Sequence, residues 1–158
     1  MDTTLRYMTR DRLPPRRHTW RQKVRVHDSV LGAQTFYVDF GEYEDGRLAE
    51  VFITAHKTGT FLRGVLDTLA QTISIGLQSG TSPLDMAAHL RGKDYPPAGR
   101  VEAAGSTVAE CLSIADYIGQ EIEANYGLDG RRADMPLAGA PAGTEVDLRR
   151  EGNEGRGG

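Results

Sequence analysis

The chain is poor in cysteine and in aromatic residues, and it has no long apolar run. Its 158 residues include one cysteine, Cys111, and 7% of them are aromatic. A single cysteine excludes an intrachain disulfide and a dithiol couple within the chain, which fits a reducing compartment. No stretch approaches the roughly 20 apolar residues that a membrane-spanning helix needs, and no signal-peptide core follows Met1. We therefore expect a cytoplasmic protein without a membrane partner.

Metal-ligand spacings are missing as well. The chain has four histidines, and neither they nor Cys111 form a pattern such as HExxH or CxxC. We therefore expect no metal site, and we expect no cofactor.

The chain is long enough for one domain with loose ends. Hydrophobic residues make up 39% and charged residues 26%, while 19 glycines indicate flexible termini. The net charge of −3 and the pI near 5.8 argue against nucleic-acid binding by the whole molecule, so no specific DNA binding is expected. The charge is uneven, because eight arginines and lysines from Arg6 to Arg25 accompany only Asp11. We predict a basic arm over 1–18, a globular domain over 19–127 and a disordered tail over 128–158.

Alternating side chains predict a first strand that begins at Thr19. One side of this strand is mainly apolar, with Trp20, Gln22, Val24 and Val26. The other side is cationic, with Arg21, Lys23 and Arg25. A loop is expected to follow over Asp28–Ala33.

A second alternating run, from Gln34 to Gly41, leads to Asp45-Gly46, the preferred pair for a two-residue hairpin turn. In that register the facing pairs are Glu44 with Arg47, Phe40 with Val51, Val38 with Ile53, and Phe36 with Ala55. This pairing collects the apolar side chains of both strands on one face, which supports the hairpin.

The reverse face of the hairpin is expected to carry Tyr37, Asp39, Tyr43, Leu48, Glu50, Phe52 and Thr54. Its aromatic and aliphatic members form more apolar surface than a small sheet leaves in water. We predict self-association through this face, as a homodimer or a higher oligomer, with Phe52 in the interface.

The most regular apolar pattern predicts an amphipathic helix over 60–79. Its apolar side chains recur every three or four residues and are Leu62, Val65, Leu66, Leu69, Ile73 and Leu77. The opposite side of this helix is expected to carry Arg63, Asp67, Gln71, Ser74 and Gln78. Capping patterns predict a short helix from Ser82-Pro83 through Leu90 and a last helix from Ser113–Asp116 to Tyr126, for which Thr107–Glu110 is an alternative cap.

Between these two helices, the prolines of Tyr95–Gly99 predict a rigid extended loop. All segments together predict an α+β fold. The sheet is expected to be antiparallel and three-stranded, with two or three helices packed on one face and flexible termini.

Cationic and glycine-bearing segments are the candidates for a phosphate or nucleotide site. The helix start at 57–60 offers free backbone N–H groups and the positive end of the helix dipole beside Lys57. The proline-rich loop offers a platform on which a base can stack. The residues predicted to bind ligand are Arg16, Arg17, Arg21, Lys57, Thr58, Gly59, Thr60, Arg63, Tyr95 and Arg100.

A structural alternative stays open for each of these candidates. Residues 57–60 can serve as a helix cap alone, and the proline-rich loop can be a connector alone. The cations of the first strand can instead pair with Asp39, Glu50 and Glu42 on the outer sheet face. His56 is a candidate general base, but no serine or carboxylate is placed by the sequence to complete a catalytic set.

Several segments, in order along the chain, carry a resemblance to one family. They are RLPPRR at 12–17, GEYEDGRLAEVFI at 41–53, HK at 56–57, SIGLQ at 74–78, PAG at 97–99 and SIADYI at 113–118. Together they resemble the C-terminal region of B12-dependent ribonucleotide reductases, the TSCPD domain. The motif that gives the domain its name falls on Leu112–Asp116, where only Ser113 and Asp116 match and Ile114 replaces the cysteine.

The resemblance implies a fold more than a function. In the full-length reductases, the cobalamin, the radical chemistry and the catalytic cysteines belong to a large barrel, and free-standing copies of the domain occur notably in phage genomes. A chain with Cys111 alone lacks the thiyl and reducing cysteines of a reductase, so we predict that it is not an enzyme on its own.

Three hypotheses for its role follow. The first is a non-catalytic, oligomeric module that binds or sequesters a nucleotide-like or phosphorylated ligand. The second is an accessory subunit or domain of a split B12-dependent ribonucleotide reductase, docked on a separate catalytic chain. The third is a structural interaction module.

Overall fold

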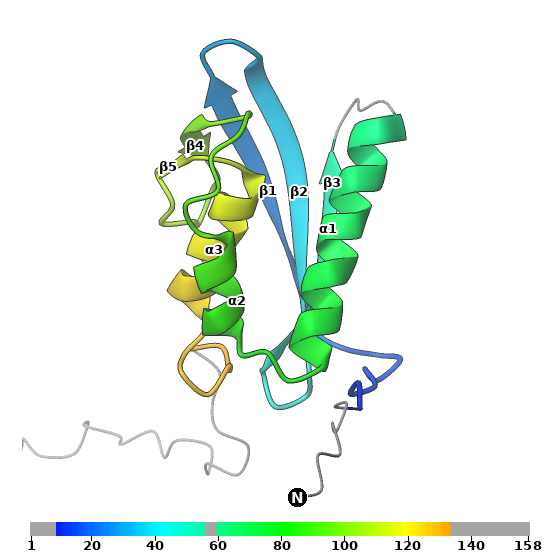
Figure 1. Cartoon of the computed structure of the whole chain (residues 1–158). Coiled ribbons are helices and arrows are strands. Elements are labelled where there is room, and N and C mark those ends of the chain that lie inside the picture. Colours follow the sequence, from blue (N-terminus) through cyan, green and yellow to red (C-terminus); the bar gives the residue numbers. More distant parts are fainter. Residues whose placement is uncertain (1–8, 56–59, 134–158) are drawn as a thin grey trace, which may run out of the picture.

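The computed structural model describes residues 9–55 and 60–133. Within these residues the chain forms a five-stranded antiparallel sheet of order β3-β2-β1-β4-β5 and three helices (Figure 1). The strands are β1 (Thr19–Asp28), β2 (Gly32–Glu42), β3 (Leu48–Ala55), β4 (Gly99–Glu102) and β5 (Glu110–Cys111). The helices are α1 (Thr60–Gln78), α2 (Pro83–Leu90) and α3 (Ile114–Asn125). The predicted α+β class is therefore confirmed.

The sheet is wider than the three strands predicted, because β4 and β5 extend it beyond β1. Both strands are too short to show an alternating pattern, and β4 begins inside the segment expected to be a loop. At the start of β4, a Cβ on Gly99 would lie 2.2 Å from the His27 carbonyl oxygen. Glycine therefore permits the close approach of β4 to β1.

The strand pairs of the predicted hairpin are confirmed, but its turn differs. Phe36, Val38 and Phe40 lie opposite Ala55, Ile53 and Val51, as predicted. The Tyr43 N–H, however, donates to the Arg47 carbonyl (2.9 Å), so Glu44 does not face Arg47. The loop has three residues and ends at Gly46, whose φ of +84° is the left-handed conformation that glycine accepts.

A β-bulge next to the turn shifts the register of this hairpin by one residue. The pairing shifts between Gly41 and Glu42, so that Glu42 lies opposite Leu48 while Gly41 lies opposite Glu50. Leu48 and Glu42 consequently turn to the inner face and are buried. The prediction that placed Leu48 on the outer face is wrong, because it assumed an unbroken period of two.

The first strand is also longer than predicted, since β1 and β2 leave only residues 29–31 between them. One carboxylate oxygen of Asp28 accepts the N–H groups of Val30 and Leu31, both at 2.8 Å, which holds the chain in a tight turn. Half of the expected loop over Asp28–Ala33 is therefore strand, and only residues 29–31 form the turn.

Figure 1 shows the three helices on the same side of the sheet. One contiguous core forms between the two layers. The sheet contributes Val24, Val26, Phe36, Val38, Phe40, Val51, Ile53 and Val101, and the helices contribute Leu66, Ala70, Ile73, Leu77, Ala87, Leu90, Ile114, Ile118 and Ile122.

Helix α1 also covers the free edge of β3, which the amphipathic pattern did not predict. Ser74 Oγ accepts the Val51 N–H (2.9 Å), and Gln78 Nε2 donates to the Ala49 carbonyl (3.0 Å). Ser74 and Gln78 are therefore buried, although they were expected on the exposed side of the helix. An open strand edge needs polar partners, so these two polar side chains face the sheet.

The two predicted helix caps are present. Ser82 Oγ accepts the Asp85 N–H (3.1 Å) ahead of Pro83, and Ser113 Oγ accepts the Asp116 N–H (3.0 Å). After α3, the chain stays attached to the hairpin through the Gly130 carbonyl, which accepts the Leu48 N–H (3.1 Å). No helix in the described part of the chain is long and apolar enough to cross a membrane.

Candidate functional site

The N-terminal arm crosses the C-terminal end of α1. The Asp11 N–H donates to the Gln78 carbonyl (2.8 Å), and Arg10 Nε donates to the Gln78 side-chain oxygen (2.6 Å). The arm satisfies a carbonyl of the last helical turn, which has no partner within the helix. These contacts place the arm cations beside the edge of the sheet.

Two adjoining hollows lie between the arm, α1 and β3. The first, about 450 Å³, is lined at its apolar end by Phe52 and Ile75, and Gln71 adds an amide. The second, about 510 Å³, is lined by the arm residues Arg10 and Arg12. Both include Arg10, Glu50 and Gln78 in their walls, so they form one groove, which we call the α1–β3 groove.

A buried carboxylate marks the boundary between the two hollows. Glu50 is neutralised by Arg17, whose guanidinium contacts both carboxylate oxygens, with Nη2 at 3.0 Å from Oε2. Gly41 provides the space for this pair, because a Cβ there would lie 2.5 Å from the Glu50 side chain. Two other cations line the groove, Arg10 and Arg12, and neither forms an ion pair with a carboxylate in the described residues.

The structural alternative proposed for the cations of β1 holds in part. Arg21 pairs with Asp39 through two hydrogen bonds of 2.6 and 2.8 Å, as that alternative predicted. Glu50 forms an ion pair with Arg17 of the arm, and Glu42 points into the core, so neither carboxylate pairs with a cation of β1. Arg16 is exposed.

Two of the predicted residues at the start of α1, Thr60 and Arg63, are described, and both lie far from the arm. Lys57, Thr58 and Gly59 are outside the described residues, and Thr60 is the first residue of α1. Arg63 is exposed one turn later. Gln78, which binds the arm, is 15 residues further along the helix, a separation of about 22 Å. One chain therefore does not bring Arg63 together with Arg16 and Arg17.

Tyr95 and Arg100 are at the opposite side of the sheet, because β4 and β3 are separated by two strands. Tyr95 is exposed, and its N–H donates to the Leu112 carbonyl (3.1 Å). Arg100 lies opposite His27 in the β1–β4 pair. The structure thus distributes the described residues of the predicted ligand set over three places.

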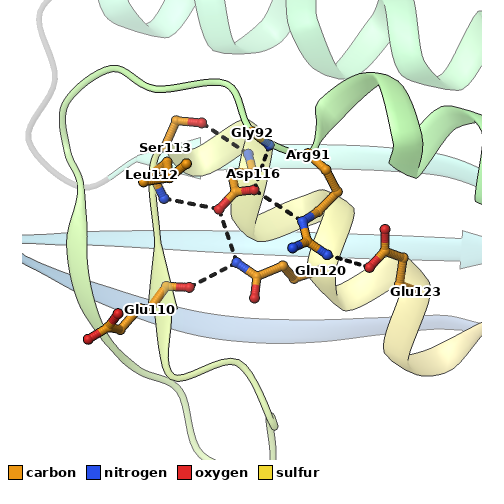
Figure 2. A network of polar contacts seen from close by, with 8 residues as sticks. All are labelled: Arg91, Gly92, Glu110, Leu112, Ser113, Asp116, Gln120 and Glu123. Atoms are coloured by element: carbon orange, nitrogen blue, oxygen red, sulfur yellow. Dashed lines mark hydrogen bonds and ion pairs between the residues drawn. The ribbon is translucent and has the colours of Figure 1, made fainter.

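A second polar centre joins α2, β5 and α3 (Figure 2). Asp116 Oδ1 accepts the Gly92 N–H (2.9 Å) and Arg91 Nε (3.2 Å). Its Oδ2 accepts the Leu112 N–H (3.0 Å) and Gln120 Nε2 (3.0 Å). Burial alone would raise the pKa of Asp116, but the N–H groups of Gly92 and Leu112, with Gln120 and Arg91, outweigh it, and the pKa lies below its usual range.

The hollow next to this centre has a volume of about 560 Å³, and Cys111 is in its wall. Burial, helped by the charge of Asp116, raises the pKa of the Cys111 thiol to about 11. A thiol with this pKa is protonated at neutral pH and is a poor nucleophile. Asp116 already accepts four hydrogen bonds, so the arrangement suits a structural junction better than a reactive site.

A third polar cluster surrounds Glu42, which is fully buried. The Tyr126 hydroxyl donates to Glu42 Oε1 (2.7 Å) and accepts Trp20 Nε1–H (3.0 Å), while His18 Nδ1 lies 3.0 Å from Oε2. Burial, with the Glu42 hydrogen bond, raises the pKa of Tyr126 well above its usual range. The sequence analysis missed this cluster because the bulge, which no motif signalled, turns Glu42 inward.

Among the described residues, no group of three or more histidine, cysteine, aspartate or glutamate side chains is placed to hold a metal ion. The polar centres that do form are closed networks of protein groups. The α1–β3 groove is an open feature with both apolar and cationic walls.

Comparison with known proteins identifies one family. The family model of the TSCPD domain matches residues 5–126. A vitamin B12-dependent ribonucleotide reductase of Bradyrhizobium diazoefficiens is 35% identical over 117 residues, which cover 74% of this chain and 9% of that protein. Those of Agrobacterium fabrum and Rhodopirellula baltica are 33% and 32% identical, covering 74% and 69% of this chain and 9% and 10% of those proteins. The chain thus spans about a tenth of the length of these curated relatives. No solved structure matches significantly.

Proposed function

Because the chain belongs to the TSCPD domain family, we propose that it is a non-catalytic module that binds a small nucleotide-like or phosphorylated ligand in the α1–β3 groove. The observation that carries this proposal is the change of character along the groove. Phe52 and Ile75 form its apolar end, and Arg10 and Arg12 form its cationic end. A nucleotide has the same two parts, a flat base and an anionic phosphate.

The dimensions and the charges of the groove support this ligand class. A volume of about 450 Å³ in the apolar part is within the range of small-molecule sites. Arginine is well suited to phosphate because its planar fork of donors matches the phosphate oxygens. The groove also has an amide, Gln71, that can hydrogen-bond the edge of a base.

Binding without catalysis is the role we propose, because the described residues offer no reactive set around the groove. The thiol of Cys111 is buried in another part of the fold and is protonated at neutral pH. Of the three carboxylates that line the groove, Asp11, Glu50 and Asp67, the buried one, Glu50, is neutralised by Arg17. A cytoplasmic location and the absence of a cofactor stay predictions.

A thermal-shift screen tests the proposal. Nucleoside phosphates, cyclic nucleotides and ADP-ribose are added to the purified chain, and a ligand at a hundredfold excess over its Kd stabilises the fold by about 2.7 kcal/mol. The melting temperature is expected to rise by several degrees for at least one of them. The Arg12→Gln variant should lose the rise, whereas Lys93→Gln, an exposed cation after α2, should keep it. No rise with any compound contradicts the proposal.

A second candidate function is favoured by the relatives themselves. The relatives named above are vitamin B12-dependent ribonucleotide reductases, and the match covers about a tenth of their length. The chain would then be an accessory subunit that docks on a separate reductase chain. Affinity purification from the native cell distinguishes this candidate, since it predicts a reductase large chain as the specific partner. If neither a ligand nor such a partner is found, the structural interaction module remains.

A further inference from the structure

One face of the sheet has no helix over it in the described part of the chain. The side chains of β1 that alternate with the buried Val24 and Val26 point to this face, which we call the open face. Cross-strand pairs share a face, so Arg21, Asp39 and Phe52 form one row on it, and Lys23, Tyr37 and Thr54 form the next. Arg25 with Glu102 and His27 with Arg100 continue the face onto β4.

The open face carries an excess of positive charge. Five cations are present, Arg17, Arg21, Lys23, Arg25 and Arg100, against the four carboxylates Asp39, Glu50, Glu102 and Glu110. The first two carboxylates are held by Arg21 and Arg17, and Glu102 hydrogen-bonds His27. Within residues 9–55 and 60–133, no ion pair joins Lys23, Arg25 or Arg100 to a carboxylate.

The cations are regularly spaced along β1. Arg21, Lys23 and Arg25 are alternate residues of one strand, so their backbone positions lie about 6.8 Å apart. Next to this row, the Arg21 guanidinium lies 5.6 Å from the centre of the Tyr37 ring. Aromatic rings and guanidinium planes are the surfaces on which unpaired bases stack.

From these features we propose that the open face over β1, β2 and β4 binds single-stranded nucleic acid without sequence preference. Lys23, Arg25 and Arg100 contact backbone phosphates, and the Arg21–Tyr37 pair stacks a base. A second copy of the chain is not the occupant of this part of the face, since two such rows of unpaired cations would repel each other. The site is separate from the α1–β3 groove, which includes neither β1 nor β4 residues.

Fluorescence anisotropy with labelled oligothymidine tests the proposal on the whole chain. Wild-type protein is expected to bind at low salt, and the slope of log K against log salt should be near −2, from about three phosphate contacts at −0.7 each. Lys23→Gln and Arg25→Gln should each weaken binding roughly fivefold to tenfold at low salt and flatten the slope by about 0.7. Tyr37→Leu should weaken binding about fivefold or more.

The matched control is Lys93→Gln, which removes an exposed cation outside the sheet and should leave binding unchanged. Thermal melts of all variants establish that they are folded, as expected for exposed positions. The proposal is overturned if wild type does not bind at low salt, or if Lys93→Gln weakens binding as much as Lys23→Gln. In a competition assay, polyglutamate and unlabelled oligothymidine of equal charge are each used to displace the labelled oligothymidine. If polyglutamate displaces it equally well, the proposal is also overturned, because the face then recognises charge alone.

Discussion

At the scale of single residues, buried carboxylates hold the fold together. Five of them are buried in the described residues, and each accepts hydrogen bonds from the protein: Asp39, Glu42, Glu50, Asp116 and Glu121. Burying a charge is costly unless it is paired and hydrogen-bonded. Removing either the charge or a donor should therefore destabilise the fold.

Asp116 gives the clearest prediction of this kind. The Asp116→Asn variant keeps the size of the side chain but replaces one acceptor oxygen by an N–H₂ group that faces N–H donors. We expect a loss of about 1–3 kcal/mol in the free energy of unfolding at pH 7, measured by urea denaturation. The matched control is Asp94→Asn, which changes an exposed carboxylate in the loop after α2 and should alter the free energy of unfolding little.

The pH dependence of stability should report the same residue. The pKa of Asp116 is lowered in the folded state, so its contribution is present above the unfolded value near 4 and is lost as the pH falls through the lowered value. Wild type should therefore lose stability more steeply than Asp116→Asn below about pH 4. Parallel curves for the two proteins would mean that the hydrogen bonds of Asp116 do not stabilise its charge.

At the scale of elements, α1 has two functions, since it covers the core and closes the edge of β3. Ser74→Ala leaves the Val51 N–H buried without its acceptor, and we expect a loss of about 1–3 kcal/mol in the free energy of unfolding. Thr72→Ala is the matched control, because Thr72 Oγ1 bonds only the helix carbonyl of Thr68 and is exposed. Equal effects of the two substitutions in chemical denaturation would contradict the role of Ser74 at the edge.

The hairpin between β2 and β3 depends on one backbone conformation. Gly46 has a φ of +84°, which a β-branched residue resists, so Gly46→Val should lower stability by about 1–3 kcal/mol. Glu44→Val changes an exposed residue of the same loop and should have a small effect. An unchanged melting temperature for Gly46→Val would show that the turn adapts without strain.

The elements differ in how far the sequence alone could predict them. The hairpin pairs and both serine caps could be predicted, because an alternating pattern and a capping box are local signals. The bulge that turns Leu48 and Glu42 inward could not, since it inserts one residue without a motif. Ser74 and Gln78 were misplaced because their burial depends on the edge of a strand distant in sequence.

At the scale of the whole molecule, the candidate site also depends on contacts between distant parts of the sequence, which local patterns do not predict. The arm was identified from its charge, and Arg17 does line the groove. The sequence indicated the pairing of Arg21 with Asp39 as an alternative, but it could not indicate that Arg17 of the arm is neutralised by Glu50, because that pair joins residues 33 positions apart. The apolar wall of the groove, Phe52 and Ile75, was also missed as a binding surface for a small molecule. It combines a strand and a helix whose contact only the fold creates.

Self-association through Phe52 remains a prediction, and the exposed apolar side chains of α1 outside the groove, Phe61, Leu62 and Val65, add to the surface available for it. Light scattering is expected to give the mass of a dimer or a higher oligomer for wild type. Phe52→Glu should reduce that mass, because the substitution places a charge in the interface. Val30→Glu changes an exposed apolar residue of the β1–β2 turn and should not. A monomeric wild type at tens of micromolar would contradict self-association.

The most direct test of the central claim is calorimetric titration of nucleoside phosphates, cyclic nucleotides and ADP-ribose into three proteins. They are wild type, Ile75→Trp and Val65→Trp, which change side chains of similar exposure, 47% and 48%, on the same helix. Only Ile75 lines the α1–β3 groove, so its larger replacement should fill the apolar end and abolish binding. The account predicts that wild type and Val65→Trp bind the same compound with similar Kd, and that Ile75→Trp does not bind it. Binding by all three proteins, or by none, would contradict it.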